Sequence, residues 1–345
     1  MVLIQRLFVA ICLWSFLAAS SAAETNVIKI ATLMPKGTGW MNLLEEWGKA
    51  VDQESQGRLK IKLYPGGIMG DEPDVLRKMH RTQLQGGVFT GYGIGRMFSP
   101  ARVLEVPFLF KNNAEVDHVR DQLMPRIVEG FRKNGYELLG WTEVGFIYFF
   151  SKEPIQSMDD MKKRRIWLWA GDTLGEAFFK ASNISPVPLS IVEVYSQLST
   201  SHGAIDTVYI SPYGALALQW NTKTKYAANI PMANGIGGLI LSRDVFESLS
   251  PDLQEILRRT GDEVGRKITS ITRKDNDQSI ALLKKEGMQF VWGWDQIDHK
   301  EVYDLRDRAA NYLAESNYIP ADYFTETRTL LEAFRLKNEV SASTK

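Results

Sequence analysis

The sequence predicts an α/β protein built as two lobes, each with a mixed β-sheet flanked by helices. Short apolar strands alternate with amphipathic helices between residues 27 and 92, a spacing typical of parallel strands joined by crossover helices. One continuous helical pattern spans residues 251–285. A chain of 345 residues is long enough to fold into two lobes with separate hydrophobic cores.

The N-terminal part alternates strands and helices. VIKIATL (27–33) is a β-rich run, and LKIKLY (59–64) alternates with period two. Between them, residues 40–54 carry an apolar stripe at helical spacing. Asp71 caps a second helix, and GGVFTGY (86–92) is the next strand with its loop. We therefore expect three parallel strands joined by two helices.

The rest of the chain continues this mixture of elements. A long β-type run over 136–150 is expected to cross between the lobes, and a strand over 225–242 to return. Shorter strands are predicted over 162–170, 203–210 and 288–294. Helices are predicted over 114–134, 172–181, 191–199 and 251–285, from 295 or 298 to about 316, and over 324–336.

Residues 1–23 have the pattern of a secretory signal peptide. Arg6 supplies a positive charge, residues 7–17 are apolar, and SSAA (20–23) offers a small-residue cleavage site. The apolar run is short of the ~20 residues that span a bilayer, so an uncleaved anchor is the less favoured alternative. Cys12 is the only cysteine, and a bulky Ile11 before it disfavours lipidation. We therefore expect a periplasmic protein with no disulfide.

Composition and motifs exclude several classes of function. The 41 basic and 41 acidic residues give a net charge of zero, which argues against a nucleic-acid partner. There is no Gly-x-Ser-x-Gly elbow, and the acidic pairs fall at helix faces and caps. The histidines are not paired at metal-ligand spacing; they are His80, His118, His202 and His299. We predict no catalytic residue, no metal and no cofactor.

Three segments resemble the solute-binding proteins of tripartite ATP-independent periplasmic (TRAP) transporters, the DctP-like family. GRLKIKLYPGGIMGDE (57–72) is close to that family's Gly-Arg-x-x-Val-x-x-Phe-Pro-Gly-Gly-x-Leu-Gly-x-Glu. VPFLF (106–110) matches its Pro-Phe-Leu-Phe. In residues 157–214, Glu193-Val194-Tyr195 matches Glu-Val-Tyr and GAIDTVYI (203–210) matches Gly-x-Val-Asp-Gly.

The resemblance implies a two-lobed periplasmic binding protein of type II-like fold, with a long helix that braces both lobes. Ligand would lie between the lobes and shift the population from open to closed, and a membrane permease would read the closed form. We expect residues 1–23 to be the signal peptide. Lobe I would comprise 24–147 with about 236–270, and lobe II 148–235 with about 271–315. Residues 316–345 would form a C-terminal helix and tail.

The family's carboxylate clamp is replaced in this chain. In the family, a segment like Asp-Leu-Lys-Gly-Leu-Lys-Ile-Arg ends on an arginine that clamps the ligand; residues 160–166 keep this frame, and Trp167 stands at the clamp. Ile147 occupies the position of a second arginine. Arginine pairs with a carboxylate through two charge-assisted hydrogen bonds, whereas tryptophan offers one N–H and a large apolar face. The replacement predicts a hydrophobic or lipid-like ligand rather than a small dicarboxylate or keto acid.

The candidate ligand-binding residues are aromatic and apolar side chains at or near these motifs. They are Trp167, Trp169, Ile147, Tyr209, Ile191, Trp40, Phe89, Tyr92 and Tyr213. The alternative for each is a place in the core, which most of the chain's aromatics must take. A rival hypothesis keeps an anionic ligand and moves the clamp to Arg165, which strand alternation puts on the same face as Trp167.

A branch of the family resembles the chain more closely in DTVYISPYGALALQW (206–220). Members of that branch lack the clamp arginine and work with a tetratricopeptide-repeat (TPR) partner, so the resemblance implies such a partner beside the permease. Two other functions remain open. One is an enzyme on the same scaffold, which would need an acid, base or nucleophile cluster in the cleft. The other is a sensor subunit of a membrane kinase.

Overall fold

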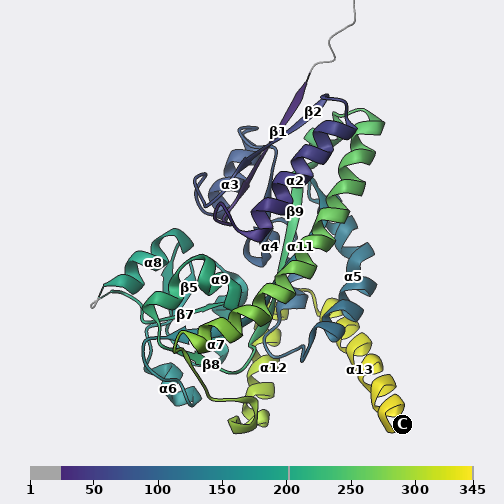
Figure 1. The fold of residues 1–345 in the computed structure, drawn as a ribbon. Coiled ribbons are helices and arrows are strands. Elements are labelled where there is room, and N and C mark those ends of the chain that lie inside the picture. Colours follow the sequence, from purple (N-terminus) through teal and green to yellow (C-terminus); the bar gives the residue numbers. More distant parts are fainter. Residues whose placement is uncertain (1–24, 201–202, 344–345) are drawn as a thin grey trace, which may run out of the picture.

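The structure is a computed structural model that describes residues 25–200 and 203–343. The predicted signal peptide and His202 lie outside the described residues. The long strand β4 (Tyr136–Ser151) joins two parts of one mixed sheet, whose strand order is β10-β8-β4-β9-β3-β1-β2, with β7 also paired to β4. Figure 1 shows these parts as an upper and a lower lobe, connected through the middle of the molecule. The predicted α/β fold with mixed sheets flanked by helices is confirmed.

The upper lobe contains the three parallel strands that the sequence predicts. β1 (Asn26–Thr32) lies between β2 (Leu59–Tyr64) and β3 (Gly86–Thr90), and β9 (Ala233–Ser242) pairs antiparallel with β3 and β4. The crossover helices α2 and α3 each begin after a polar side chain that caps the first turn. Thr38 accepts a hydrogen bond from the Met41 amide, and Asp71 accepts one from the Glu72 amide at 2.7 Å. The helices are α2 (Gly39–Glu54), α3 (Glu72–His80), α4 (Gly91–Phe98), η1 (Ser99–Glu105), α5 (Asn113–Lys133) and α10 (Arg243–Glu247).

The lower lobe is built on the last four residues of β4. They pair with β7 (Thr207–Ile210), and Phe150 and Ser151 also pair with β8 (Tyr226–Ala228). The strand predicted over 162–170 is shorter, because residues up to Lys162 form helix α6 (Met158–Lys162) and only β5 (Trp167–Trp169) is extended. Its other elements are β6 (Val187–Leu189), α7 (Thr173–Ala181), α8 (Ile191–Ser199), α9 (Pro212–Ala217), η2 (Trp220–Lys223), β10 (Gln289–Val291), η3 (Trp294–Gln296) and α12 (His299–Glu315).

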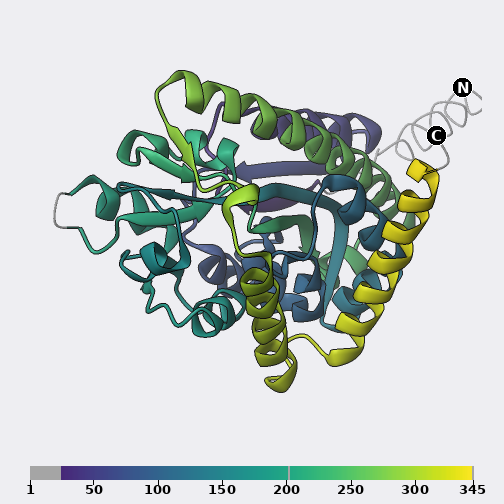
Figure 2. The ribbon, with the colours of Figure 1, turned by 90° about the horizontal axis from the view of Figure 1, so that it is seen from below.

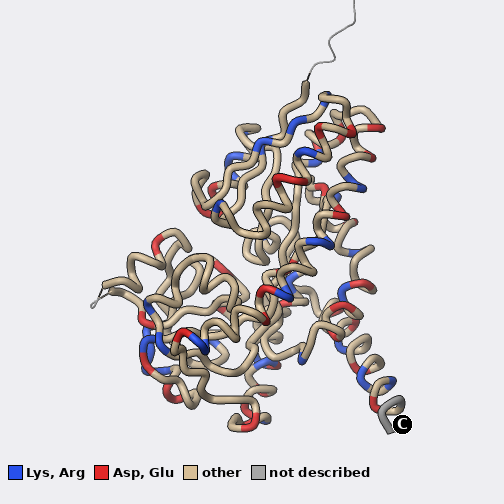
Figure 3. The backbone as a smooth tube through the Cα atoms, in the orientation of Figure 1, with Lys and Arg blue, Asp and Glu red and all other residues tan. Residues whose placement is uncertain are grey.

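The 35-residue helix α11 (Pro251–Lys285) runs from the top of the upper lobe down to the lower lobe (Figure 1). It packs directly on β4, because a side chain at Gly140 would come within 2.2 Å of the Gly261 carbonyl oxygen. Arg273 of α11 also binds the buried Glu143 of β4 at 2.9 Å. The predicted bracing helix is therefore present. Figure 3 shows acidic and basic residues interleaved along it rather than gathered by sign.

Where β4 passes from the upper to the lower lobe, its pairing with β9 shifts register between Glu143 and Gly145. Gly145 has φ of +88°, which favours glycine, and a side chain there would meet the Asn276 amide nitrogen at 2.4 Å. Asn276 of α11 donates to the Val144 carbonyl at 3.0 Å and accepts from the Tyr213 amide at 2.9 Å. The long helix is thus fastened to the crossing strand at this irregular point.

The C-terminal helix is longer than predicted and belongs to the outside of the upper lobe. α13 (Ala321–Ser343) packs on α5, and Arg126 of α5 binds Asp322 at 2.6 Å. Figure 2 shows α13 along one flank, beyond the central α12. Among the described helices, none has both the length and the apolar character needed to cross a bilayer.

Candidate ligand-binding site

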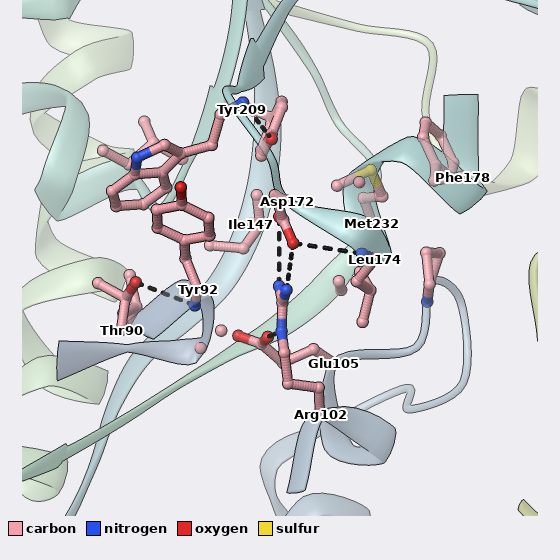
Figure 4. A pocket seen from close by; sticks show the side chains of 18 of the residues that line it. Thr90, Tyr92, Arg102, Glu105, Ile147, Asp172, Leu174, Phe178, Tyr209 and Met232 are labelled. Atoms are coloured by element: carbon pink, nitrogen blue, oxygen red, sulfur yellow. Dashed lines mark hydrogen bonds and ion pairs between the residues drawn. The ribbon is translucent and has the colours of Figure 1, made fainter. Parts of the chain in front are cut away.

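A cavity of about 130 Å³ lies between the two lobes. The upper lobe contributes the loop from β3 to α4 and the end of η1, and the lower lobe contributes β5, β7 and the start of α7. The crossing strands β4 and β9 form its floor through Ile147 and Asn234. Figure 4 shows Arg102, Glu105 and Asp172 meeting in the middle, with Tyr92 on one side and Phe178 on the other.

An aromatic wall forms one side of this cavity, which we call the first cavity. The ring of Trp167 stacks on Tyr209 with centroids 5.0 Å apart, and Trp169 lies 4.6 Å from Tyr92. Trp167 is only 1% exposed, and its indole N–H donates to the Leu189 carbonyl at 3.0 Å. Trp167 is therefore both a core residue and part of the wall, and it leaves no free donor for a ligand.

A buried charged triad occupies the other side of the first cavity. Arg102 of η1 donates through Nε to Glu105 at 2.6 Å and through Nη2 to Asp172 at 3.3 Å, and Nη1 also binds Asp172. Asp172 is the cap of α7, as the sequence predicts, and accepts the Leu174 amide at 3.2 Å. Burial raises the pKa of Glu105, against the opposing effect of Arg102. Two carboxyls thus share one guanidinium, and the upper lobe is joined to the lower.

The amide of Asn234 borders the first cavity without a hydrogen-bond partner. Both of its polar atoms are buried, and neither has a partner among the described residues. The hydroxyl of Tyr209 accepts from the Trp169 amide at 3.4 Å, and burial raises its pKa, so it keeps its proton. A buried amide left unpaired costs about 1–3 kcal/mol, which a ligand that bonds it would recover.

Direct hydrogen bonds hold the lobes together around the cavity. Asp71 of the upper lobe accepts from Trp169 Nε1 at 3.0 Å, from Ser190 Oγ at 2.5 Å and from the Ile191 amide at 3.2 Å. Tyr92 donates its hydroxyl to the Ala170 carbonyl at 2.6 Å. The structure is therefore a closed conformation.

A second cavity of about 90 Å³ adjoins the first. The two share Thr90, Val144, Ile191 and Ile210 as lining residues, so these four form the boundary between them. Glu72 lines the second cavity and accepts the Thr90 and Gly93 amides at 2.7 and 2.6 Å. Its burial raises the pKa of Glu72 to about 8, the hydrogen bonds opposing that shift.

The structure divides the predicted ligand-binding residues into three groups. The first cavity is lined by Tyr92, Ile147, Trp167, Trp169, Ile191 and Tyr209. The second cavity is lined by Trp40, Phe89 and Tyr213, again with Ile191.

Arg165 lines neither cavity. Its side chain is 49% exposed and pairs with Asp206 at 3.2 Å. The alternation that would bring Arg165 to the face of Trp167 requires an extended strand, and β5 begins only at Trp167.

Sequence reasoning missed the polar groups of the first cavity, which are Arg102, Glu105, Asn234 and, as a lining residue, Asp172. The sequence does contain a signal for Arg102 and Glu105. Arg102 and Glu105 are three residues apart within an otherwise apolar stretch that leads into VPFLF, a spacing that pairs charges on one helix face. Asn234 has no such signal, because only the passage of β9 through the cleft places it at the wall of the first cavity.

Among the described residues, no group of three or more His, Cys, Asp and Glu side chains is arranged to hold a metal ion. The fold, the interlobe cavity and the closed lobes define a solute-binding protein. The chain belongs to the DctP family, bacterial extracellular solute-binding protein family 7, which it matches over residues 30–315.

Curated relatives share most of their length with this chain. The sialic acid-binding periplasmic protein SiaP of Vibrio cholerae is 24% identical over 304 residues, covering 84% of this chain and 89% of SiaP. The 2,3-diketo-L-gulonate-binding periplasmic protein YiaO of Escherichia coli is 21% identical over 263 residues, covering 73% of this chain and 76% of YiaO.

Solved structures share the fold. A TRAP periplasmic solute-binding protein from Pseudomonas putida F1 with bound D-glucuronate has a TM-score of 0.78 at 21% identity, covering 88% of this chain and 96% of that one. A sugar acid binding protein from Advenella mimigardefordensis in complex with galactonate has a TM-score of 0.80 at 15% identity, covering 90% and 99%.

The ligands named for these relatives are sugar acids, which contradicts the hydrophobic or lipid-like ligand predicted from Trp167 and Ile147. That prediction rested on the loss of two arginines and did not consider the other side chains that line the cleft. The first cavity also contains the guanidinium of Arg102, which is paired with Glu105 and Asp172, and the side-chain amide of Asn234, which a pure hydrocarbon would leave unpaired. The TPR partner stays a prediction.

Proposed function

We propose that this protein is the periplasmic solute-binding subunit of a TRAP-type transporter, and that it binds an organic acid and delivers it to the membrane permease. In this proposal, residues 24–147 with about 236–270 form lobe I and residues 148–235 with about 271–315 form lobe II. The observation that carries the ligand class is a cavity of mainly apolar lining that also holds the Arg102 triad and the unpaired amide of Asn234.

Arg102 is the one Lys or Arg among the described residues that line the first cavity, and an acidic ligand would share it with Glu105 and Asp172. With both carboxyls ionised, Arg102, Glu105 and Asp172 carry one positive and two negative charges. Because burial raises the pKa of Glu105, the carboxyl can take up a proton when a ligand carboxylate arrives, and the net charge of the site stays the same. Arg102 Nη2 makes one hydrogen bond within the described part of the chain although it carries two hydrogens, so a further acceptor can be bound.

The walls of the first cavity offer an apolar surface to the carbon skeleton of that acid. Trp167, Phe178 and Ile147 face the cavity without a donor or acceptor to offer, since the one indole N–H among them is bonded to the backbone. Burying hydrocarbon against such walls contributes about 25 cal/mol per Å².

The proposal is tested on protein purified from the periplasm without refolding. Native mass spectrometry gives the bound mass, and calorimetry then compares phenylacetate, isocaproate and octanoate with their matched amides and with D-glucuronate. We expect the carboxylic acids to bind more tightly than their matched amides. The variant Asn234→Leu should weaken binding of the acids by roughly tenfold, the loss of about 1.4 kcal/mol of hydrogen bonding. Equal binding of acids and amides would contradict the proposed ligand class.

A further inference from the structure

The second cavity contains an indole donor that the protein leaves unused. Trp40 is 6% exposed, lines the second cavity, and its Nε1 is buried without a partner among the described residues. An indole nitrogen can only donate, so the missing group is an acceptor. Leaving such a donor unpaired in a dry site has a free-energy cost that a bound acceptor removes.

The other indoles of the cleft have partners, whereas Trp141, which lines neither cavity, shares the unpaired state of Trp40. Trp167 donates to the Leu189 carbonyl and Trp169 donates to Asp71. On helix α2 itself, two turns further along the same face, Trp47 donates to the Thr260 hydroxyl at 3.0 Å. The fold therefore supplies partners to the neighbouring indoles and none to the one that lines the second cavity.

We propose that the second cavity is a subsite for the far end of an elongated ligand, whose acid end lies in the first cavity, and that Trp40 Nε1 donates a hydrogen bond to a neutral acceptor at that far end. This inference rests on the proposed function. Both cavities are lined by the boundary residues Thr90, Val144, Ile191 and Ile210. A ligand that passes from one cavity to the other would therefore contact these four residues. The Ile191 amide is held by Asp71 across the lobes, so closure itself shapes this neck.

The chemistry of the second cavity sets the class of the far end. No lysine or arginine lines it within the described residues, so a second carboxylate would be buried without a cation. The one titratable carboxyl on its wall, Glu72, is held by the Thr90 and Gly93 amides and can only repel an anion when ionised. Apolar side chains such as Leu33, Val88 and Phe89 complete the lining. A ketone, amide, ester or ether on a hydrocarbon chain meets these conditions, and a dicarboxylate does not.

Matched ligands and variants test the subsite. Calorimetry is run with butanoic, octanoic and dodecanoic acids and with the methyl-keto acids of the two longer lengths. Trp40→Phe removes the donor and keeps an aromatic ring. We expect it to weaken the keto acids by about two- to tenfold relative to the plain acids of equal length. Trp47→Phe is the matched control on the same helix and should leave that ratio unchanged.

A second variant keeps the test informative if Trp40→Phe fails to fold. Ala217→Leu enlarges a partly buried side chain that lines the second cavity and not the first, and should weaken the longer acids while butanoic acid binds as before. If short and long acids bind alike in every variant, the second cavity is not a subsite, although the proposed function stands. If no acid binds to the unmodified protein, the proposed function fails and this inference fails with it.

Discussion

Trp169 and Asp71 join the two lobes across the cleft, with the indole Nε1 at 3.2 and 3.0 Å from the two carboxylate oxygens. The same carboxylate caps helix α3 and accepts from Ser190 and the Ile191 amide. One acidic side chain therefore both begins a helix in the upper lobe and fixes the start of a helix in the lower lobe. Because these bonds exist only when the lobes meet, they favour the closed state.

Weakening this contact should favour the open state. Asp71→Asn keeps a side chain that caps α3 but removes the charge that strengthens the interlobe bonds. We expect ligand affinity to fall by roughly tenfold, since a hydrogen bond to a charged group contributes ~1.5–3 kcal/mol. Small-angle scattering of the ligand-free protein should show a larger radius of gyration. Ser190→Ala, which removes one of these bonds, should have a smaller effect, and an unchanged radius in both variants would contradict the role of Asp71.

Ligand binding should take up protons through Glu105. The pKa of Glu105 is raised by burial, so the carboxyl is the group in the triad most ready to be protonated when a ligand anion arrives. Affinity for an acid should therefore fall as the pH rises through this raised pKa. Calorimetry in buffers of different ionisation enthalpy measures the protons taken up. Glu105→Gln should abolish the uptake, whereas uptake that persists in this variant would assign it to another group.

Glu72 should make the ligand-free protein less stable as the pH rises. The ordinary pKa of this carboxyl is 4.5 and burial raises it to about 8, so the folded state binds more protons than the unfolded state between these values. The free energy of unfolding therefore falls across this window, with a limiting slope of about 1.4 kcal/mol per pH unit from this group. Urea unfolding at several pH values gives the slope. In Glu72→Gln the slope should be shallower, and an identical slope would refute the assignment.

Restoring a cation in the first cavity should change its ligand preference. Ile147 lines the cavity at the position where the family carries a second arginine, and its side chain is only partly buried. Ile147→Arg should raise the affinity for D-glucuronate by tenfold or more, because arginine binds a carboxylate through two charge-assisted hydrogen bonds. Ile147→Met, which adds length without charge, is the control. Calorimetry that finds equal affinities in both variants would mean that position 147 does not reach the ligand.

The sequence predicts the elements better than the contents of the cleft. The three parallel strands and the 251–285 helix follow from local periodicity and caps, and the structure contains them. Trp167 is different. Strand alternation predicts on which face of the strand its side chain lies, but it does not predict that the indole N–H donates to the Leu189 carbonyl. The Arg102–Asp172 pair joins residues 70 positions apart, and nothing in either segment indicates the other.

The sequence motifs around the cleft predict the wrong ligand class for a physical reason. Compared with the family pattern, the sequence lacks two arginines. An interpretation limited to those two motifs considers only this loss of two charges. The fold supplies another guanidinium from η1 and an amide from β9, both brought in by tertiary packing. Arg165 shows the opposite case, since a charge close to the motif in sequence is drawn to Asp206 on the surface.

The register shift of β4 beside Gly145 lies at the wall of the cleft, since Val144 lines both cavities and Gly235 lines the first. Asn276 ties the long helix to the strand at this shift, which is one of two in the pairing of β4 with β9. Rotation of one lobe against the other at this point would therefore move residues that line the cleft. Ligand contact and the angle between the lobes are thus linked through the same short segment of β4.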